Sequence, residues 1–161
     1  IDNSGRAGLI GFSAAGRQNV ARLIDGDYPQ VRGLFPPEMS GFAVVRRQDL
    51  LDALKRARLV VEKNSAVRLS FSEGQVILEA GQGDNAQTSE ALEAYLNGED
   101  ITMAFNPTFL QEGLSSVSSP FIRVSFTHST KPAVMTAQDE IDGDDLEDFR
   151  LLQMPIRIYG N

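Results

Sequence analysis

Several residue types that carry out chemistry in proteins are absent or scarce in this chain. Its 161 residues include no cysteine, no tryptophan and a single histidine, His128. Without cysteine the fold can use neither disulfide bonds nor thiolate-bound metal, which fits the reducing cytoplasm. His128 has no evident partner for acid–base catalysis, so we interpret it as an ordinary strand or loop residue. The sequence therefore indicates a non-enzymatic protein, and we expect it to need no metal and no cofactor.

The sequence also lacks segments that would direct it to a membrane. No apolar run approaches the roughly eighteen residues that a membrane-spanning helix needs, so we expect no membrane partner. The first residues, IDNSGRAG, contain neither an initiator methionine nor a signal-peptide pattern. We interpret the chain as a piece of a longer polypeptide and expect it in the cytoplasm.

Two segments look like ligand-binding loops but lack the residues that binding would require. GQGDNAQ (81–87) contains glycines but neither the lysine nor the helix start of a phosphate-binding loop, so we predict a turn. DEIDGDDLED (139–148) is acidic, but Gly143 is not at the position that a calcium-binding EF-hand loop requires. We predict a solvated, mobile hairpin loop there.

The net charge of −7 conceals a separation of the two signs along the chain. Residues 46–68 contain seven basic and three acidic residues, whereas residues 69–100 and 138–148 each contain seven acidic residues and no basic one. A locally cationic segment in an anionic protein suits a surface that faces a polyanion. A solvated helix with several arginines explains the charges equally well.

Apolar spacing predicts an α+β chain with an internal repeat. Two strands around a glycine turn (9–24) precede a proline-rich joint (25–38) that cannot be regular helix or central strand. The order strand–helix–strand–strand–strand then occurs at 42–96 and again at 101–158, and VRLSFS (67–72) matches IRVSFT (122–127). Each copy alone is too small for a stable core. Together we expect them to pack two helices on one face of antiparallel sheets.

The helices and the last strand of the repeat have particular signals. Apolar residues at 50, 51, 54, 57 and 61 predict a helix over 48–61. Asn106 and Pro107 predict the start of the second helix, because asparagine caps free amides and proline suits the first position. The final segment, FRLLQMPIRIY (149–159), predicts a strand with Leu152, Met154, Ile156 and Ile158 on one face.

These features together resemble the β sliding clamp of bacterial DNA polymerase III and look most like its actinobacterial branch. The resemblance rests on the repeat and on three segments: LIDGDYPQVRGLFP (23–36), FNPTFLQEGL (105–114) and LLQMPIRI (151–158). It implies the DNA-clamp fold, with residues 1–33 as the terminal strands of the second clamp domain plus a linker, and residues 34–161 as the third domain.

The resemblance also implies a function. A clamp is a processivity factor without enzymatic activity: two three-domain subunits form a ring that encircles duplex DNA and slides on it without reading its sequence. Polymerase subunits, the clamp loader and repair proteins dock on the ring through short peptides containing Leu and Phe. The full-length protein is then a homodimer, and since the first domain is missing here, we expect this chain not to close the ring.

Three sets of site residues follow from the resemblance. The peptide pocket would consist of Pro29, Arg32, Gly33, Leu34, Asn106, Phe109, Thr130, Pro132, Leu152, Gln153, Met154, Pro155, Ile156 and Arg157. The DNA-facing candidates are Lys55, Arg56 and Arg58. The ring interface would include Leu59, Val60, Val61, Glu90 and Glu93.

Three pocket positions depart from what the family leads us to expect. Phe109 stands where many relatives have tyrosine, Gly33 where some have arginine, and Gln153 where an aliphatic residue is common. The second helix also departs from a basic DNA-facing surface, because its only charged residue is Glu112. The alternative is a generic α+β protein-interaction module without a DNA role, in which Met154 is simply a core residue. Titration with a Leu-Phe peptide distinguishes the two.

Overall fold

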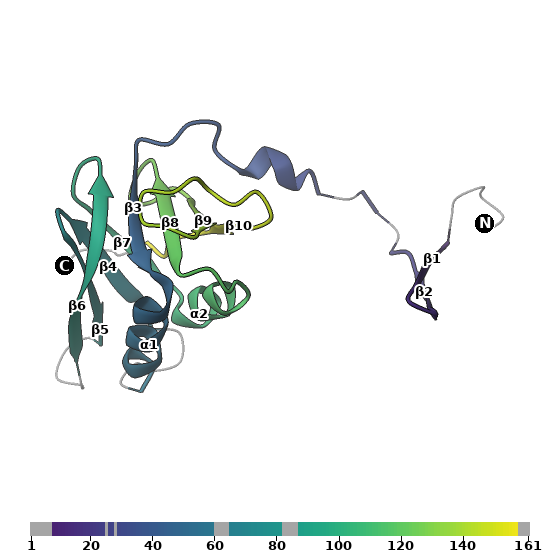
Figure 1. Ribbon diagram of the computed structural model, residues 1–161, viewed down its shortest axis with the longest axis horizontal. Helices are drawn as coiled ribbons and strands as arrows, with labels where there is room; N and C mark the ends of the chain where they lie inside the picture. The colour runs from purple at the N-terminus through teal and green to yellow at the C-terminus, as the bar shows by residue number, and fades with distance from the viewer. Residues whose placement is uncertain (1–7, 25, 28, 60–64, 82–86, 158–161) are drawn as a thin grey trace. The chain divides into compact units, whose positions relative to one another are not determined.

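In the computed structural model the chain divides into two compact units, residues 1–34 and 35–161 (Figure 1). The structure describes residues 8–24, 26–27, 29–59, 65–81 and 87–157.

The first unit contains a hairpin and a short helix. Strands β1 (Leu9–Ala14) and β2 (Arg17–Arg22) pair antiparallel across a two-residue turn. Both turn residues have positive φ, 50° at Ala15 and 74° at Gly16, which matches the right-handed twist of the two strands. The two strands predicted around a glycine turn are therefore confirmed. A 3-10 helix, η1 (Val31–Leu34), follows in the proline-rich joint.

The second unit contains the predicted repeat. Its elements in chain order are β3 (Gly41–Arg46), α1 (Arg47–Ala57), β4 (Val67–Ser72), β5 (Gln75–Ala80), β6 (Thr88–Asn97), β7 (Ile101–Phe105), α2 (Pro107–Ser115), β8 (Phe121–Phe126), β9 (Ala133–Gln138) and β10 (Arg150–Gln153). Strand–helix–strand–strand–strand thus occurs twice, as the sequence predicts.

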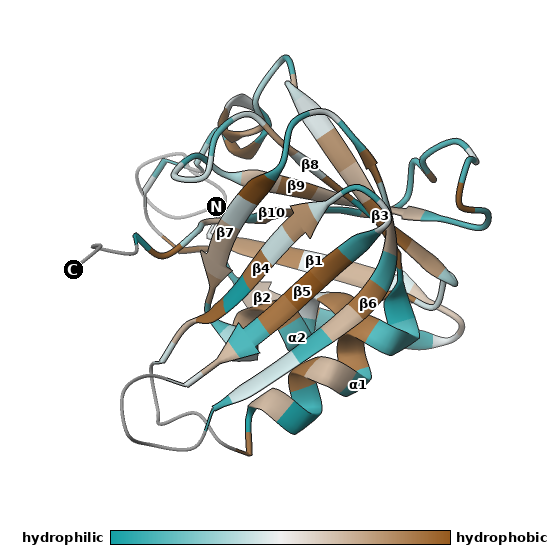
Figure 2. Cartoon of the chain, turned by 90° about the vertical axis from the view of Figure 1, so that its left-hand side faces the viewer, coloured by the Kyte–Doolittle hydropathy of each residue, from teal (hydrophilic) through white to brown (hydrophobic). Residues whose placement is uncertain are grey.

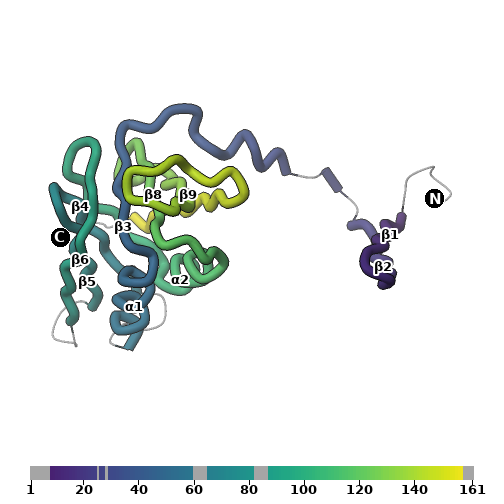
Figure 3. Tube along the Cα trace, in the orientation of Figure 1, coloured from purple at the N-terminus to yellow at the C-terminus, as the bar shows by residue number. Residues whose placement is uncertain are grey.

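The strands of this unit form one curled antiparallel sheet in the order β10-β9-β8-β3-β6-β5-β4-β7. Figure 3 shows β4, β5 and β6 on one side of β3 and β8 and β9 on the other. The leading strand of each repeat pairs with the strand that follows the helix in the other repeat: β3 with β8, and β7 with β4. The two repeats are therefore joined by an exchange of their leading strands.

The two exchanged ladders have the same register. Val45 lies opposite Ile122 in one ladder, and Phe105 lies opposite Val67 in the other. Ile122 and Val67 are the first residues of the duplicated IRVSFT and VRLSFS segments. Since Val45 and Phe105 each directly precede the N-cap residue of their helix, the second unit has an internal pseudo-twofold symmetry.

Both helices pack on the same face of this sheet and form the core with it. Helix α1 lies beneath β5 and β6, with brown apolar stretches between teal polar ones (Figure 2). Leu50 and Leu54 of α1 and Leu110 and Leu114 of α2 are fully buried. Alternate residues of β4 and β8 are also buried against them, each burial contributing about 1.5–3 kcal/mol.

Helix α1 ends at Ala57, so the predicted helix over 48–61 is too long at its C-terminal end. The amide of Leu59 donates to the carbonyl oxygen of Arg56 at 3.0 Å. This is a 3-10 bond, which tightens and closes the last turn. Leu59 is 86% exposed, and Val61, the last residue of the predicted apolar pattern, lies outside the described residues.

Candidate functional site

The three basic side chains predicted to face DNA lie at the C-terminal end of α1, and each has a partner. Lys55 Nζ lies 2.7 Å from Asp52 Oδ1. Arg58 Nη1 donates to Gln111 Oε1 of α2 at 2.6 Å, which links the two helices. The third, Arg56, forms a bidentate pair with Glu90.

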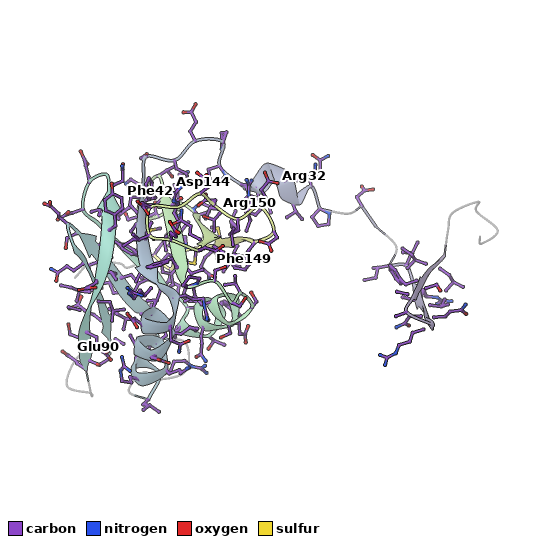
Figure 4. All side chains as sticks on the ribbon, in the orientation of Figure 1. Arg32, Phe42, Glu90, Asp144, Phe149 and Arg150 are labelled. Carbon is purple, nitrogen blue, oxygen red and sulfur yellow. The ribbon has the colours of Figure 1, made fainter. Side chains whose placement is uncertain are left out.

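This bidentate pair joins α1 to β6, and Glu90 is labelled at the lower end of β6 in Figure 4. Arg56 Nε donates to Glu90 Oε1 at 2.9 Å and Nη2 donates to Oε2 at 2.6 Å. The hydrogen bond from Arg56 holds the pKa of Glu90 below its usual value and raises the pKa of Arg56 itself. Of the three basic candidates, Arg58 alone is bonded to a neutral group, so its charge is the least compensated.

The carboxylate of Asp52 on α1 stays ionised through its neighbours. Gln48 Nε2 donates to both carboxylate oxygens at 3.0 Å. The hydrogen bond from Gln48, followed by that from Lys55, lowers the pKa of Asp52. An ionised Asp52 reduces the positive potential around Lys55, so this end of α1 is less basic than its sequence suggests.

The residues predicted at a ring interface are divided by the structure. Leu59 is exposed just beyond α1, and Glu93 is exposed on β6. Glu90 is occupied by Arg56, as described above. Val60 and Val61 lie outside the described residues. Their role in an interface stays a prediction.

Helix α2 begins as predicted and presents one aromatic side chain to solvent. Asn106 Oδ1 accepts from the amides of Thr108 at 2.9 Å and Phe109 at 3.4 Å, and Pro107 occupies the first helical position. These contacts satisfy amides that otherwise lack partners. Phe109 is the third residue of α2, and its 58% exposure makes its side chain available to a ligand.

The C-terminal segment differs from its prediction. Strand β10 ends at Gln153, not at residue 159, and Leu151 rather than Leu152 packs against the core, beside Gly113 of α2. The predicted face of Leu152, Met154, Ile156 and Ile158 is therefore wrong.

The reason lies in the two prolines near this strand. The partner strand β9 starts at Ala133, opposite Gln153, directly after Pro132. Pro155 has no amide to extend the ladder. The chain consequently leaves β9, and Met154 (58% exposed) and Ile156 face solvent, whereas Gln153 is buried. Ile158 lies outside the described residues.

The loop between β8 and β9 contains Thr130 and Pro132 of the predicted pocket. The amide of Thr130 donates to His128 Nδ1 at 3.3 Å, and the amide of Lys131 donates to the His128 carbonyl oxygen at 3.0 Å. His128 therefore shapes a turn, as the interpretation of it as a loop residue requires.

Three predicted pocket segments come together in the second unit. Gln153 lies opposite Ala133, next to Pro132. The amide of Ile156 donates at 2.7 Å to the carbonyl oxygen of Ala104, two residues before Asn106. The segments around 130–133, 104–109 and 152–157 are thus neighbours.

The remaining pocket candidates belong to the first unit. Pro29, Arg32, Gly33 and Leu34 are all exposed. The amide of Val31 donates to the Pro29 carbonyl oxygen at 2.8 Å and begins η1. Their participation in a common pocket with the second unit stays a prediction.

Sequence reasoning missed the anchoring of the acidic loop 139–148. The buried side chain of Gln138 donates to the Gly143 carbonyl oxygen at 2.6 Å and to Asp145 Oδ1 at 3.1 Å. Arg123 lies 3.4 Å from Asp145 Oδ1, and its guanidinium covers the Phe42 ring at 4.1 Å from the centroid. The loop thus folds back on β8 and β9. A polar glutamine at the end of an apolar strand was the available signal.

Among the described residues, no group of three or more His, Asp or Glu side chains is arranged to hold a metal ion. Neither α1 nor α2 has the length and apolarity needed to cross a membrane, and no other described helix does. The arrangement offers exposed apolar side chains beside helix α2 and a partly compensated basic end of α1.

Comparison with known proteins gives a consistent result. A family model described as the DNA polymerase III beta subunit, C-terminal domain, matches residues 32–156. The beta sliding clamp of Streptomyces coelicolor is 48% identical over 153 residues, covering 95% of this chain and 41% of that protein.

Solved structures agree in fold. The DNA polymerase sliding clamp from Bacillus subtilis matches with a TM-score of 0.82 at 25% identity, covering 96% of this chain and 40% of that chain. A sliding clamp from Pseudomonas aeruginosa bound to griselimycin matches with a TM-score of 0.82 at 21% identity, covering 93% and 39%. The predicted fold is thereby confirmed, and the chain spans about two fifths of the length of these relatives.

Proposed function

Because this chain belongs to the DNA polymerase III beta-subunit family, the bacterial β sliding clamps, we propose that it is part of a processivity factor that encircles duplex DNA. The family consists of non-enzymatic processivity factors, so the chain is not an enzyme. In this proposal the whole protein forms the ring as a homodimer in the cytoplasm, and polymerase subunits, the clamp loader and repair proteins are tethered to it.

The chain would then contain parts of two clamp domains. Residues 1–33 would be the terminal strands of the second domain with its linker, and residues 34–161 the third domain. The family match over residues 32–156 and the boundary between the compact units after Leu34 support this division. Ring formation would belong to the whole protein, since the matched model describes a C-terminal domain.

The second unit would dock partners through short peptides. The observation that carries this proposal is that segment 152–157 lies next to both the 130–133 segment and the 104–109 segment. Two apolar side chains of these segments, Phe109 and Met154, are exposed to solvent and are not packed in the core. Methionine is pliable and repacks around different ligands. Burying one Leu and one Phe of a peptide contributes about 1.5–3 kcal/mol each. After ordering costs, an affinity of roughly micromolar is expected.

A titration tests this proposal directly. A fluorescent peptide ending in a Leu-Phe motif is titrated with the wild-type chain, and saturable binding in the micromolar range is expected. Griselimycin, which is bound to the Pseudomonas aeruginosa clamp, should compete with the peptide. Met154→Ala should weaken binding about tenfold, corresponding to about 1.4 kcal/mol.

Ile141→Ala provides the matched control, because Ile141 is another exposed aliphatic residue but lies in the acidic loop. Its affinity should equal that of the wild type. Absence of saturable binding by the wild type, or an unchanged affinity in Met154→Ala, would reject the peptide-docking proposal.

The basic end of α1 would face DNA in the assembled ring. A sliding surface needs non-specific attraction to phosphates and no base contacts. Lys55, Arg56 and Arg58 supply the cationic groups, and their local partners moderate the attraction. If the chain binds the peptide but substitution of these basic residues leaves its DNA affinity unchanged, a generic interaction module without a DNA role is favoured instead.

A further inference from the structure

The two edges of the sheet are joined by the residues that follow β10. The sheet order begins with β10 and ends with β7. After Gln153 the chain crosses from the first edge to the last, and the Ile156 amide donates to the Ala104 carbonyl oxygen of β7 at 2.7 Å. Among the described residues this is the one backbone hydrogen bond between the 154–157 segment and β7.

The internal symmetry explains why these two residues meet. Ala104 lies two residues before Asn106, the N-cap residue of α2, and Val44 lies two residues before Arg46, the N-cap residue of α1. Ala104 is therefore the counterpart of Val44. In the first repeat Val44 lies opposite Tyr95 of β6. The symmetry thus predicts that the counterpart of Tyr95 lies opposite Ala104.

A second route, through the strand pairs β5–β6 and β9–β10, identifies the counterpart of Tyr95 independently. Ala80 lies opposite Thr88 in the first repeat. Its counterpart is Ala137, because Ala80 pairs with Val67 and Ala137 pairs with Ile122. The register of β9 and β10 puts residue 149 opposite Ala137. Seven residues lead from Thr88 to Tyr95 and from 149 to Ile156, so both routes reach Ile156.

We propose that residues 154–157 are a strap that completes the second repeat, closes the sheet between β10 and β7, and positions Met154 for peptide binding. The strap is the counterpart of the last part of β6. By the same count residues 154–157 correspond to residues 93–96, and three of these, Ala94, Tyr95 and Leu96, pair with β3 in the first repeat. In the second repeat Pro155 stands in place of Ala94 and has no amide to donate. Closure therefore depends on the Ile156 amide.

The position of Met154 follows from the two ends of the strap. Gln153 is held opposite Ala133, and Ile156 is held at Ala104. Only Met154 and Pro155 lie between these anchors. The proline also restricts Met154 to extended backbone conformations. Ile156 is accordingly a positioning residue in addition to its predicted place in the pocket, because its backbone amide holds the strap to β7. This inference rests on the proposed peptide-docking function.

The decisive variant is Ile156→Pro, which removes the amide donor. Ile156→Ala removes most of the side chain but keeps the donor. Arg157→Pro places the same ring one residue later, at an amide without a hydrogen bond in the described part of the chain. One hydrogen bond is worth about 0.5–1.5 kcal/mol, so Ile156→Pro should weaken peptide affinity about 2- to 13-fold. Ile156→Ala and Arg157→Pro keep this hydrogen bond, so each should weaken peptide affinity less than Ile156→Pro does. Ile141→Ala, in the acidic loop and outside the pocket, should match the wild type.

Hydrogen exchange of the wild-type chain gives a second readout that needs no variant and no peptide. The Ile156 amide should exchange more slowly than the amide of Arg157, for which the described part of the chain shows no backbone hydrogen bond. Equal loss of affinity in Ile156→Pro and Ile156→Ala, or wild-type affinity in Ile156→Pro, would overturn the strap. An unprotected Ile156 amide would overturn it as well. If the wild type binds no peptide, the proposed function fails, while protection of Ile156 still decides whether the sheet is closed.

Discussion

Arg56 on α1 and Glu90 on β6 hold each other through two parallel hydrogen bonds, although the family resemblance assigns them to different surfaces. One was expected to face DNA and the other a neighbouring subunit. Their pairing means that the two surfaces share an electrostatic contact at the end of α1. A change in either residue will alter the charge presented on both.

The first prediction concerns the pH dependence of this pair. The lowered pKa of Glu90 means that its bond to Arg56 stabilises the fold fully above the ordinary value of 4.5 and that this stabilisation is lost as the pH falls through the lowered pKa. Urea unfolding should show Glu90→Gln to be less stable than the wild type at neutral pH, with the difference shrinking in acid. Glu93→Gln, an exposed acid on the same strand, should show no such trend. A difference independent of pH would contradict the pairing.

The second prediction concerns the start of α2. Asn106→Ala removes the oxygen that accepts from Thr108 and Phe109, and should lower the free energy of unfolding by about 1 kcal/mol. Asn106→Asp keeps an acceptor and should retain most of the stability. Chemical denaturation of the three proteins measures both values. Equal losses in the alanine and aspartate variants would show that the cap is not what matters.

The third prediction concerns a close backbone approach at the start of β3. A Cβ atom on Gly41 would lie 2.7 Å from the Asn97 carbonyl oxygen and 2.9 Å from Phe126 Cε2. Since the backbone cannot yield cheaply, Gly41→Ala should destabilise the protein by about 1–3 kcal/mol. Gly33→Ala is the control, because a Cβ there meets nothing within 4 Å. A thermal or urea midpoint for Gly41→Ala equal to that of the control would refute the prediction.

The fourth prediction concerns DNA. Arg58 is bonded to the neutral Gln111, whereas Lys55 is paired with Asp52. If α1 contacts phosphates, Arg58→Gln should reduce the slope of log affinity against log salt by about one, and Lys55→Gln should reduce it less. Fluorescence anisotropy with a labelled duplex over a salt series gives these slopes. Arg150→Gln, an exposed arginine on β10, should leave the slope unchanged, and an equal effect there would argue against α1 as the DNA face.

Local features of the fold were predictable because they depend on neighbours in sequence. The alternation of VRLSFS and IRVSFT predicted two half-buried strands, and β4 and β8 alternate in burial as expected. Asn106 followed by Pro107 predicted the start of α2 to the residue. The duplication of one element order predicted that two helices pack on one face of antiparallel sheets, and in the structure the strands of the two repeats join in one eight-stranded sheet.

Features that depend on distant residues were not predictable in the same way. Nothing local indicates that Arg56 meets Glu90, or that Gln138 turns the acidic loop back onto the sheet. The end of β10 was misjudged because the alternation of apolar residues continues past Gln153, whereas its partner strand does not. The hydrogen bond from Ile156 to Ala104 emerges only from the register of the whole sheet.

The exchange of leading strands has a consequence for folding during translation. On the ribosome β3 is synthesised before β8, so the edge of β3 that pairs Gly41 with Phe126 has no hydrogen-bonding partner until β8 emerges. The unpaired N–H and C=O groups of such an edge can form hydrogen bonds with strands of other chains. The first repeat by itself therefore leaves a strand edge exposed to aggregation, and this edge is covered only after the ribosome has synthesised β8 of the second repeat.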